Sequence, residues 1–273
     1  MKYRKLGSTG LLVSEIGLGC EGFAEDECRN TKRLLDEAES QGINYFDLYA
    51  SDPKVRASVG EALRGRREKF MIQSHVCSVW KDGQYKRTRN IDEVKAGMEE
   101  MLSLLQTDYI DVGMIHYVDS VKDWHTVAGG PVLAYVKELK EKGVIRHIGL
   151  SSHNPEVALE AVKSGDIEVL MFSVNPCYDL QPASEDVEEL WAEKNYKEHL
   201  INMNPERQEL YETCQRLGIG ITVMKAFGGG DLLDEKLSPA GKALTVNQCI
   251  HYALTRPGVA TVLTGAHSVE QLE

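Results

Sequence analysis

Two aspartates and two histidines are the residues in this sequence whose types and positions suit acid–base chemistry. Asp47 lies near the end of the apolar run NYFDLY and Asp52 follows shortly after it, while His75 and His116 end the runs KFMIQSH and YIDVGMIH. An imidazole has an ordinary pKa of about 6.5, and a neighbouring carboxylate stabilises its charge. We therefore predict catalytic roles for Asp47, Asp52, His75 and His116, with His75 or His116 as the general acid. Tyr49 is a weaker candidate, because the direction of its side chain along the strand is uncertain.

Histidine and carboxylate side chains are also common metal ligands, so a non-redox or metal-dependent enzyme is an alternative prediction. The six cysteines are widely spaced and contain no CxxC pair, so they do not indicate a zinc or iron–sulfur site within these residues. We expect them to be reduced thiols, most of them buried.

Short apolar runs alternate with helical patterns along the whole chain. Eight runs read as strands: EIGLGC, NYFDLY, KFMIQSH, YIDVGMIH, VIRHIGLS, IEVLMFSV, GITVMK and VATVLTG. Alternating strands and helices favour a parallel sheet, and eight repeats favour its closure into an α/β fold, the (β/α)8 TIM barrel. An open doubly wound sheet is the runner-up. In a barrel, the carboxyl ends of the strands share one mouth, so we expect Asp47, His75, His116, Ser151 and Lys225 to meet there.

The remaining segments complete one domain, residues 1–273. KYRKLGSTGLLVSE predicts an N-terminal β-hairpin that could plug the bottom of the barrel. The spacing of apolar residues predicts a helix over 91–105, and Asn204, Pro205 and Gly218 predict the cap, first position and end of another. Residues 176–203 form a long connection with helical character, which would either cover a substrate or lie on the surface. We expect the basic segment 77–90 to be a solvated loop, or else to attract an anionic substrate or an acidic partner.

The composition narrows the class of partner. A net charge of −11 has the wrong sign for nonspecific attraction to nucleic acid or an anionic membrane. No apolar stretch approaches the roughly 18 residues that span a bilayer, and the N-terminus lacks the apolar core of a signal peptide. We therefore predict a cytoplasmic protein without nucleic-acid or membrane partners.

The order and spacing of several segments resemble the aldo-keto reductases along the entire chain. The matching segments are IGLGCEGF, GINYFDLY, VGEAL, DYIDVGMIHY, GVIRHIGLSSHNPEV and VLTGAHSVEQL. The resemblance implies a (β/α)8 barrel that binds NADP, or less often NAD, and transfers hydride between the cofactor and a small carbonyl compound or its alcohol.

The family combines an aspartate, a tyrosine that donates the proton, a lysine and a histidine. Asp47 matches the aspartate and His116 the histidine, whereas Asp52 stands at the tyrosine position and His75 at the lysine position. The resemblance therefore implies a reductase with a non-standard proton donor. A barrel that binds cofactor without turnover is the alternative.

The resemblance also implies a cofactor site. Gly19, Cys20 and Glu21 match the turn after the first barrel strand, and Ser151 matches a serine that binds the nicotinamide amide. Ser152 replaces the usual asparagine, and Phe172 or Ser173 replaces the usual glutamine. The other matching positions are Met224, Lys225, Ala226, Phe227, Gly228, Gly265, Ala266 and Gln271.

The chain stops where the family continues its eighth helix, so we expect that helix to be truncated. The most similar divergent members often continue into a ferredoxin-like region with iron–sulfur clusters. The resemblance thus implies a possible iron–sulfur domain or protein partner. A cofactor-binding subunit of a larger redox complex is accordingly a further alternative.

Overall fold

Eight parallel strands close into a barrel in the computed structural model, which describes residues 1–23, 27–191 and 202–273. The strands are β3 (Ile16–Leu18), β4 (Tyr45–Leu48), β5 (Met71–Val76), β8 (Ile110–Ile115), β9 (Ile145–Ser152), β10 (Val169–Ser173), β11 (Gly220–Met224) and β12 (Val259–Thr264). The circle closes through β12 and β3, with Val262 opposite Ile16. Each strand overlaps one of the eight apolar runs, so the predicted (β/α)8 barrel is confirmed.

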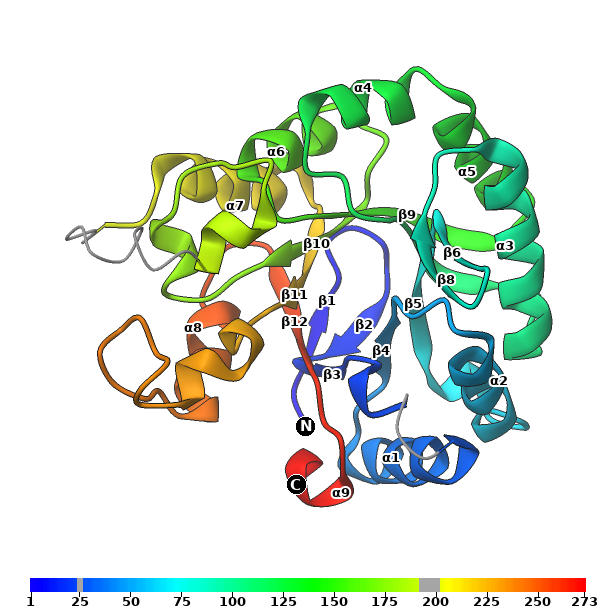
Figure 1. Cartoon of the computed structure of the whole chain (residues 1–273), viewed down its shortest axis with the longest axis horizontal. Helices are drawn as coiled ribbons and strands as arrows, with labels where there is room; N and C mark the ends of the chain where they lie inside the picture. The colour runs from blue at the N-terminus through cyan, green and yellow to red at the C-terminus, as the bar shows by residue number, and fades with distance from the viewer. Residues whose placement is uncertain (24–26, 192–201) are drawn as a thin grey trace.

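Helices surround the barrel and cover its outer face (Figure 1). The α-helices are α1 (Glu27–Gln41), α2 (Pro53–Ala62), α3 (Ile91–Leu105), α4 (Val121–Ala128), α5 (Pro131–Glu141), α6 (Pro155–Lys163), α7 (Pro205–Leu217), α8 (Val246–Leu254) and the short α9 (Val269–Leu272). The predicted limits of α7 are confirmed. The side chain of Asn204 accepts a hydrogen bond from the backbone N–H of Glu206, Pro205 begins the helix, and Gly218 ends it at a φ of 71°.

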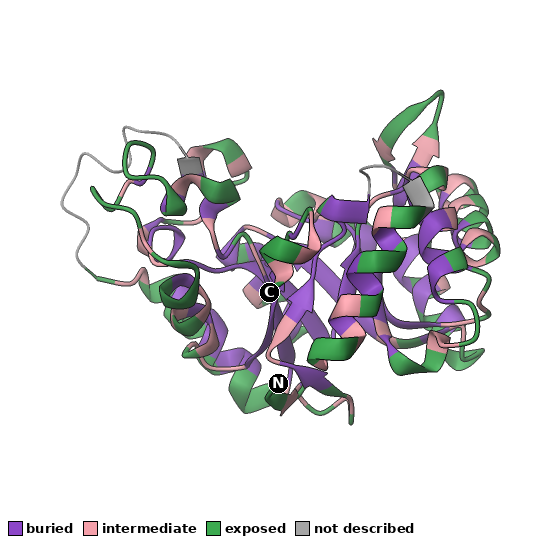
Figure 2. Cartoon of the chain, turned by 90° about the horizontal axis from the view of Figure 1, so that it is seen from below, coloured by how far each residue is buried: buried purple, intermediate pink, exposed green. Residues whose placement is uncertain are grey.

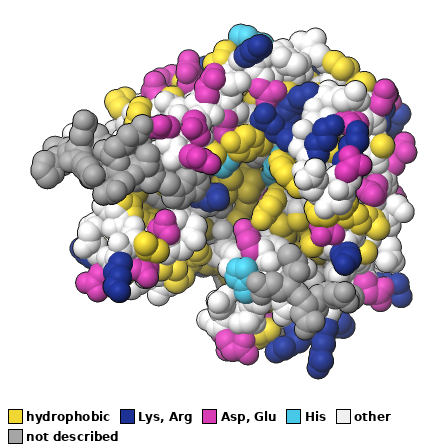
Figure 3. All heavy atoms as spheres, viewed as in Figure 1, with side chains coloured by type: hydrophobic (Ala, Val, Ile, Leu, Met, Phe, Trp, Pro, Cys, Tyr) yellow, Lys and Arg dark blue, Asp and Glu magenta, His cyan; other side chains and the backbone are white. Residues whose placement is uncertain are grey.

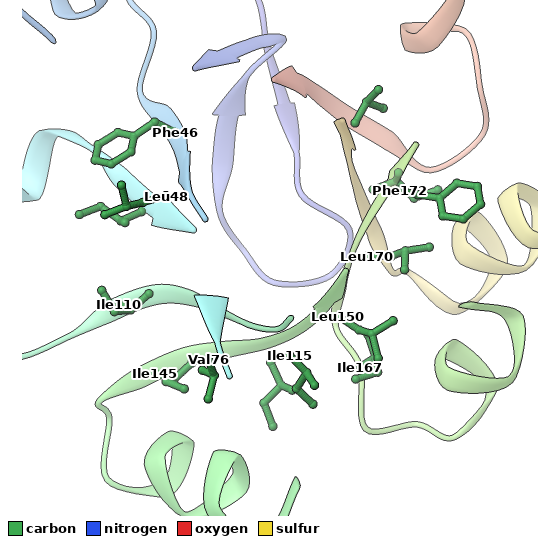
Figure 4. Packing of buried hydrophobic residues seen from close by; sticks show 14 of the residues in the cluster. Phe46, Leu48, Val76, Ile110, Ile115, Ile145, Leu150, Ile167, Leu170 and Phe172 are labelled. Atoms are coloured by element: carbon green, nitrogen blue, oxygen red, sulfur yellow. The ribbon is translucent and has the colours of Figure 1, made fainter. Parts of the chain in front are cut away.

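Side chains alternate between the two faces of each strand, and this alternation creates two apolar clusters. Phe46 and Leu48 of β4 belong to the larger cluster, between the barrel and its helices, as do Leu170 and Phe172 of β10. Figure 4 shows these side chains on the outer side of the strands, and burial is highest where strands and helices meet (Figure 2). Burying one such side chain contributes about 1.5–3 kcal/mol to folding. The alternating residues, including Asp47, consequently face the barrel interior.

The N-terminal hairpin covers the end of the barrel where the strands begin. Its strands, β1 (Tyr3–Lys5) and β2 (Leu12–Ser14), pair antiparallel, and the fully buried Leu6 and Val13 join the interior apolar cluster. Gly7 is required because its φ is 55° and a Cβ atom there would lie 2.3 Å from the carbonyl oxygen of Gly218. The predicted plug is confirmed, and the open mouth is therefore at the opposite end.

A second hairpin corrects the expectation of a solvated loop over 77–90. Strands β6 (Ser78–Lys81) and β7 (Gln84–Arg87) pair antiparallel around Asp82 and Gly83, whose φ values of 53° and 77° suit a two-residue hairpin turn. Its lysines are not free to attract an anion, because Lys81 and Lys86 both pair with Glu93 of α3. Pairing between its two strands and ion pairs with α3 thus order this segment.

The long connection after β10 is described only in part. It contains the 3-10 helices η3 (Tyr178–Leu180) and η4 (Val187–Trp191). The rest of the predicted helical stretch, residues 192–201, lies outside the described residues.

Candidate functional site

A continuous chain of hydrogen bonds joins four side chains at the mouth of the barrel. Oδ1 of Asp47 lies 2.9 Å from Nε2 of His75, and Nδ1 of His75 lies 2.6 Å from Nδ1 of His116. Nε2 of His116 lies 2.8 Å from the hydroxyl oxygen of Tyr85. Neighbouring strands produce this arrangement. Asp47 of β4 and His75 of β5 face the interior of the barrel, and His116 directly follows β8. Asp47, His75 and His116 are all buried.

The hydrogen bonds assign the proton positions on both imidazoles when each ring is neutral. A carboxylate can only accept, so Nε2 of His75 carries the proton and donates to Asp47. Nδ1 of His75 must then accept, so Nδ1 of His116 donates. Nε2 of His116 is left as an acceptor for the hydroxyl of Tyr85. All three bonds therefore point in one direction, from Tyr85 toward Asp47.

The same geometry accommodates one additional proton. In that state the donor and the acceptor exchange roles in every hydrogen bond except the one from His75 to Asp47. A positively charged His75 donates from Nε2 to Asp47 and from Nδ1 to His116. His116 then carries its own proton on Nε2 and donates to the oxygen of Tyr85. The chain can thus hold or release one proton without moving a heavy atom.

Gln73 orients Asp47 from the floor of the mouth. Its Nε2 donates to Oδ1 of Asp47 at 2.6 Å, while its Oε1 accepts from the hydroxyls of Tyr45 at 2.7 Å and Thr222 at 3.0 Å. Gln73, Tyr45 and Thr222 are fully buried. The carboxylate is therefore held by two donors, Gln73 and His75, and does not depend on solvent for its orientation.

Burial sets the protonation of the two groups at the outer end of the chain. Burial, reinforced by His75 and by the guanidinium groups of Arg89 and Arg87, holds the pKa of His116 well below its ordinary value. Burial also raises the pKa of Tyr85. At neutral pH, His116 is accordingly uncharged and Tyr85 retains its proton, so His116 itself is a poor site for the stored charge.

Asp52, which the sequence placed in the catalytic set, lies at the start of α2. Its side chain accepts a hydrogen bond from the backbone N–H of Lys54 at 2.8 Å and caps the helix. The chain from Asp47 to Tyr85 does not include it. Tyr49 is 40% exposed and likewise stands outside the chain, since the ring nitrogens of His116 are taken by His75 and Tyr85.

Two serines of the predicted cofactor set face the barrel interior, and a third does not. Oγ of Ser151 accepts from the backbone N–H of Tyr117 at 2.8 Å, which leaves its own hydrogen available to donate. Ser173 ends β10 on the interior side, and its buried Oγ has no hydrogen-bond partner within the described residues. Ser152 instead faces outward, is fully buried, and donates to Asp119 at 3.0 Å. Met224 ends β11 and packs against the interior cluster.

The loops after β3 and β12 meet at one side of the mouth. The backbone N–H of Gly19 donates to the carbonyl of Thr264 at 2.8 Å, and a Cβ on Gly22 would lie 2.0 Å from the carbonyl oxygen of Ala266. The carboxylate of Glu21 lies over both Gly19 and Gly265. Burial, with a smaller contribution from Asp47, raises the pKa of Glu21.

Other predicted cofactor positions lie in the loop after β11 and around α9. Ala226 is buried, Phe227 is partly buried, and Gly228 begins the 3-10 helix η6 (Gly228–Leu233). Gly229 and Gly230 have φ values of 73° and 108°, with open space where a Cβ would be. In α9, the side chain of Gln271 accepts a hydrogen bond from the backbone N–H of His267. Cys20, which follows β3, is buried.

Backbone strain is concentrated where barrel strands reach the mouth. Cys77, Tyr117 and Lys225 have φ values of 74°, 51° and 61°, and they follow β5, β8 and β11 closely or directly. Such conformations cost on the order of 1–3 kcal/mol each and are typical of functional sites. Figure 3 shows a hollow at the centre of the barrel, with hydrophobic side chains around it and histidine and basic side chains at its rim.

Within the described residues, no group of three or more histidine, cysteine, aspartate or glutamate side chains is arranged to hold a metal ion. Five cysteines in this part of the chain, Cys20, Cys77, Cys177, Cys214 and Cys249, are free and buried, as expected. No described helix has both the length and the apolar character needed to cross a membrane.

Tyr85 is the site residue that the sequence reasoning missed. Its only sequence signal is indirect, because the Asp82–Gly83 pair between two strand-compatible segments is typical of a hairpin turn. Even a predicted hairpin would not have identified His116 as the partner of Tyr85, since that contact depends on how the hairpin docks.

Comparisons with known proteins agree with the fold. The Aldo/keto reductase family model matches residues 15–247. The chain is 30% identical to the uncharacterized oxidoreductase YqkF of Bacillus subtilis, over all of this chain and 89% of that protein. It is 25% identical to the aldo-keto reductase YhdN of Bacillus subtilis, over all of this chain and 87% of the relative.

Solved structures give the same result. The holo form of the aldo-keto reductase AKR11C1 from Bacillus halodurans superposes with a TM-score of 0.76 at 26% identity, over all of this chain and 88% of that one. The family match, the relatives and the closed barrel lead to one conclusion: this chain belongs to the aldo/keto reductase family and is an oxidoreductase.

Proposed function

We propose that this protein is an NAD(P)-dependent oxidoreductase that interconverts a small carbonyl compound and its alcohol. The observation that carries the proposal is the hydrogen-bonded chain of Asp47, His75 and His116 at the mouth of an aldo/keto reductase barrel. Reduction of a carbonyl group requires a hydride and a proton. The cofactor supplies the hydride when bound, and the hydrogen-bonded side chains store the proton at the mouth.

The side chains around the mouth fit a nicotinamide cofactor. The donor hydrogen of Ser151 and the unpartnered hydroxyl of Ser173 suit a carboxamide, which offers both an acceptor and a donor. Met224 offers a polarizable side chain that can cover a ring face. These three residues stand for the serine, glutamine and aromatic residue expected from the family pattern. Orphaned buried hydroxyls cost stability, so an unpaired Ser173 supports a ligand-binding role.

Backbone groups supply the rest of the proposed cofactor site. Gly229 and Gly230 leave the backbone of the β11 loop open to close approach, and Lys225 adds a positive charge for a phosphate. Gly19, Cys20, Gly265, Ala266 and Gln271 would complete the proposed site from the loops after β3 and β12. Glu21 would have to rotate away from Gly19 and Gly265 when a nucleotide binds, because two negative charges repel at short range. NADP is the proposed cofactor, with NAD as the alternative.

Titration of the purified protein with NADPH and NADH, followed by calorimetry or fluorescence, tests the proposal. We expect saturable binding of NADPH and oxidation of bound NADPH by at least one member of a panel of small aldehydes and ketones. If neither nucleotide binds, the result would contradict the proposed reductase function and favour a non-redox barrel enzyme. Tight binding without turnover by any carbonyl in the panel would favour a cofactor-binding subunit.

A further inference from the structure

The β6–β7 hairpin places one side chain, Tyr85, against the outer end of the histidine pair. Tyr85 lies opposite Trp80 in the hairpin, close to its turn. Its ring lies edge-on to His116, with centroids 5.7 Å apart and an interplanar angle of 80°. Tyr85 is 49% exposed, so its phenol links the buried imidazoles to the open side of the mouth.

Several contacts fix the base of the hairpin to the barrel. The guanidinium group of the fully buried Arg56 donates to the carbonyl of Ala50 at 3.2 Å and to that of Ser78 at 3.1 Å. The hydroxyl of Ser51 donates to the carbonyl of Val79 at 3.0 Å. Each of these bonds restricts how far the first strand of the hairpin can shift along the mouth. The hairpin is therefore held in register with the barrel.

The second strand of the hairpin is also tied at its base, to the loop that follows His116. Arg87 donates to the backbone carbonyl of Tyr117 at 2.7 Å, and Arg89 donates to the same carbonyl at 3.0 Å. Arg89 also pairs with Asp123 of α4 at 2.7 Å. Anchoring on both sides limits the positions open to Tyr85, which explains how a residue on a projecting hairpin can complete an interior chain.

We propose that Tyr85 is the catalytic residue that exchanges the proton with the substrate oxygen, and that His116, His75 and Asp47 supply and hold that proton. The inference rests on the proposed carbonyl–alcohol function and names the donor for it. A phenol in contact with a relay replaces the tyrosine missing at position 52, but it comes from a different element of the fold. In the part of the chain that the structure describes, no other hydroxyl contacts the ring nitrogens of His116, which are occupied by His75 and Tyr85.

The step balances without a free tyrosinate. In the proton-loaded chain, His75 is positively charged beside Asp47, and Nε2 of His116 donates to the oxygen of Tyr85. As hydride reaches the carbonyl carbon, the O–H bond of Tyr85 breaks and its proton forms the new O–H bond of the alcohol. Nε2 of His116 returns a proton to Tyr85, and Nδ1 of His75 returns one to His116. The chain ends neutral, and a proton from water reloads it.

The charges around the chain favour this division of roles. The groups that face His75 and His116 are Asp47 of β4, Tyr85, Arg87 and Arg89 of the hairpin segment, and His153 after β9. The carboxylate of Asp47 contacts His75, whereas the two arginines oppose a positive charge on His116. The stored positive charge is therefore favoured on His75. Tyr85 delivers the proton, because it is the half-exposed member of the four hydrogen-bonded side chains.

Tyr85→Phe tests the inference, with Tyr135→Phe on α5 as the matched control. Removal of the Tyr85 hydroxyl should lower kcat for NADPH-dependent reduction by about 100-fold, in line with the loss of a general acid. KM and nucleotide affinity should stay close to wild type, and the decline of kcat at high pH should disappear. Tyr135→Phe, which keeps the mouth intact, should match wild type in every respect.

A second measurement does not need turnover. Two-bond ¹⁵N–¹H correlation spectra of the free protein report which ring nitrogen of His116 bears hydrogen. In wild type, Nε2 should show the shift of a hydrogen-bonded acceptor, and Tyr85→Phe should move that signal while Tyr135→Phe should not. Wild-type turnover in Tyr85→Phe, or an unchanged His116 spectrum, would overturn the role of Tyr85 but leave the proposed function in place. Absence of nucleotide binding and turnover in wild type would overturn the proposed function as well.

Discussion

The hydroxyl oxygen of Tyr85 lies 2.8 Å from Nε2 of His116, although the two residues belong to different elements of the fold and are 31 positions apart. This contact extends the chain from the buried Asp47 to the open mouth of the barrel. It gives the protein a phenol at the mouth, whereas Asp52, which is predicted to match the tyrosine of the family, caps α2. The contact therefore connects the two histidines to the proposed proton path.

His75→Gln should abolish proton transfer while preserving most of the packing. A glutamine amide can still donate to Asp47, but it cannot accept a proton on one side and release it on the other as an imidazole does. We expect kcat to fall by about 100-fold or more, with nucleotide affinity retained. His125→Gln on the exposed surface of α4 is the matched control. Equal rates for His75→Gln and the control would show that His75 carries no proton.

Asp47→Asn should separate charge from geometry. The amide oxygen of the substituted side chain can still accept from Gln73 and His75, so thermal unfolding should change little. Loss of the negative charge, however, removes the carboxylate that contacts Nε2 of His75 at 2.9 Å and would stabilise its positive charge in the proton-loaded state. The kcat for carbonyl reduction should consequently fall below that of wild type, although nucleotide affinity is retained. A kcat equal to that of wild type would contradict a storage role for Asp47.

Ser173→Ala should affect ligand binding and stability in opposite ways. Because Oγ of Ser173 has no partner within the described residues, its removal should leave the free energy of unfolding unchanged or slightly higher. If the hydroxyl binds the nicotinamide carboxamide, Ser173→Ala should bind NADPH more weakly, by about 1 kcal/mol of binding free energy. Ser152→Ala, which breaks the bond to Asp119, should instead lower stability. Calorimetry and denaturant titration measure both quantities, and unchanged NADPH affinity in Ser173→Ala would contradict the assignment.

Glu168 should make stability depend on pH in the acid range. Burial alone would raise its pKa, but hydrogen bonds from His147, Lys140 and the backbone N–H of Ile148 lower it to about 2. A lowered folded-state pKa means that the stabilisation is complete above the ordinary value of 4.5 and is lost as pH falls toward 2. The gap in unfolding free energy between wild type and Glu168→Gln should shrink over this interval. A constant gap would contradict the assigned role.

The fold was largely predictable because its signals are local. Eight apolar runs match eight barrel strands, and Asn204, Pro205 and Gly218 mark the ends of α7 through capping and backbone conformation alone. The segment over 77–90 was misjudged because its high charge resembles a solvated loop. Its lysines in fact pair with Glu93, and its Asp82–Gly83 turn was the signal that should have outweighed the charge.

The candidate site was only partly predictable because it depends on contacts between distant segments. Strand-end position was enough to select Asp47, His75 and His116, which the structure brings into hydrogen-bond contact. Asp52 was predicted from its match to the family's tyrosine position, and its side chain caps α2. Tyr85 was not predicted, because it reaches the mouth through the docking of a hairpin. Neither outcome follows from alternation along a strand, so pattern alone could not identify them.

Hydride transfer is the central claim, and deuterium labelling tests it most directly. The protein is incubated with NADPH deuterated at the transferable position of the nicotinamide ring and with a carbonyl substrate found in the panel. Mass spectrometry then measures the alcohol product. We expect one deuterium on the former carbonyl carbon, with formation of labelled product slowed in Tyr85→Phe. An alcohol without deuterium, or no alcohol from any carbonyl in the panel, would contradict the account.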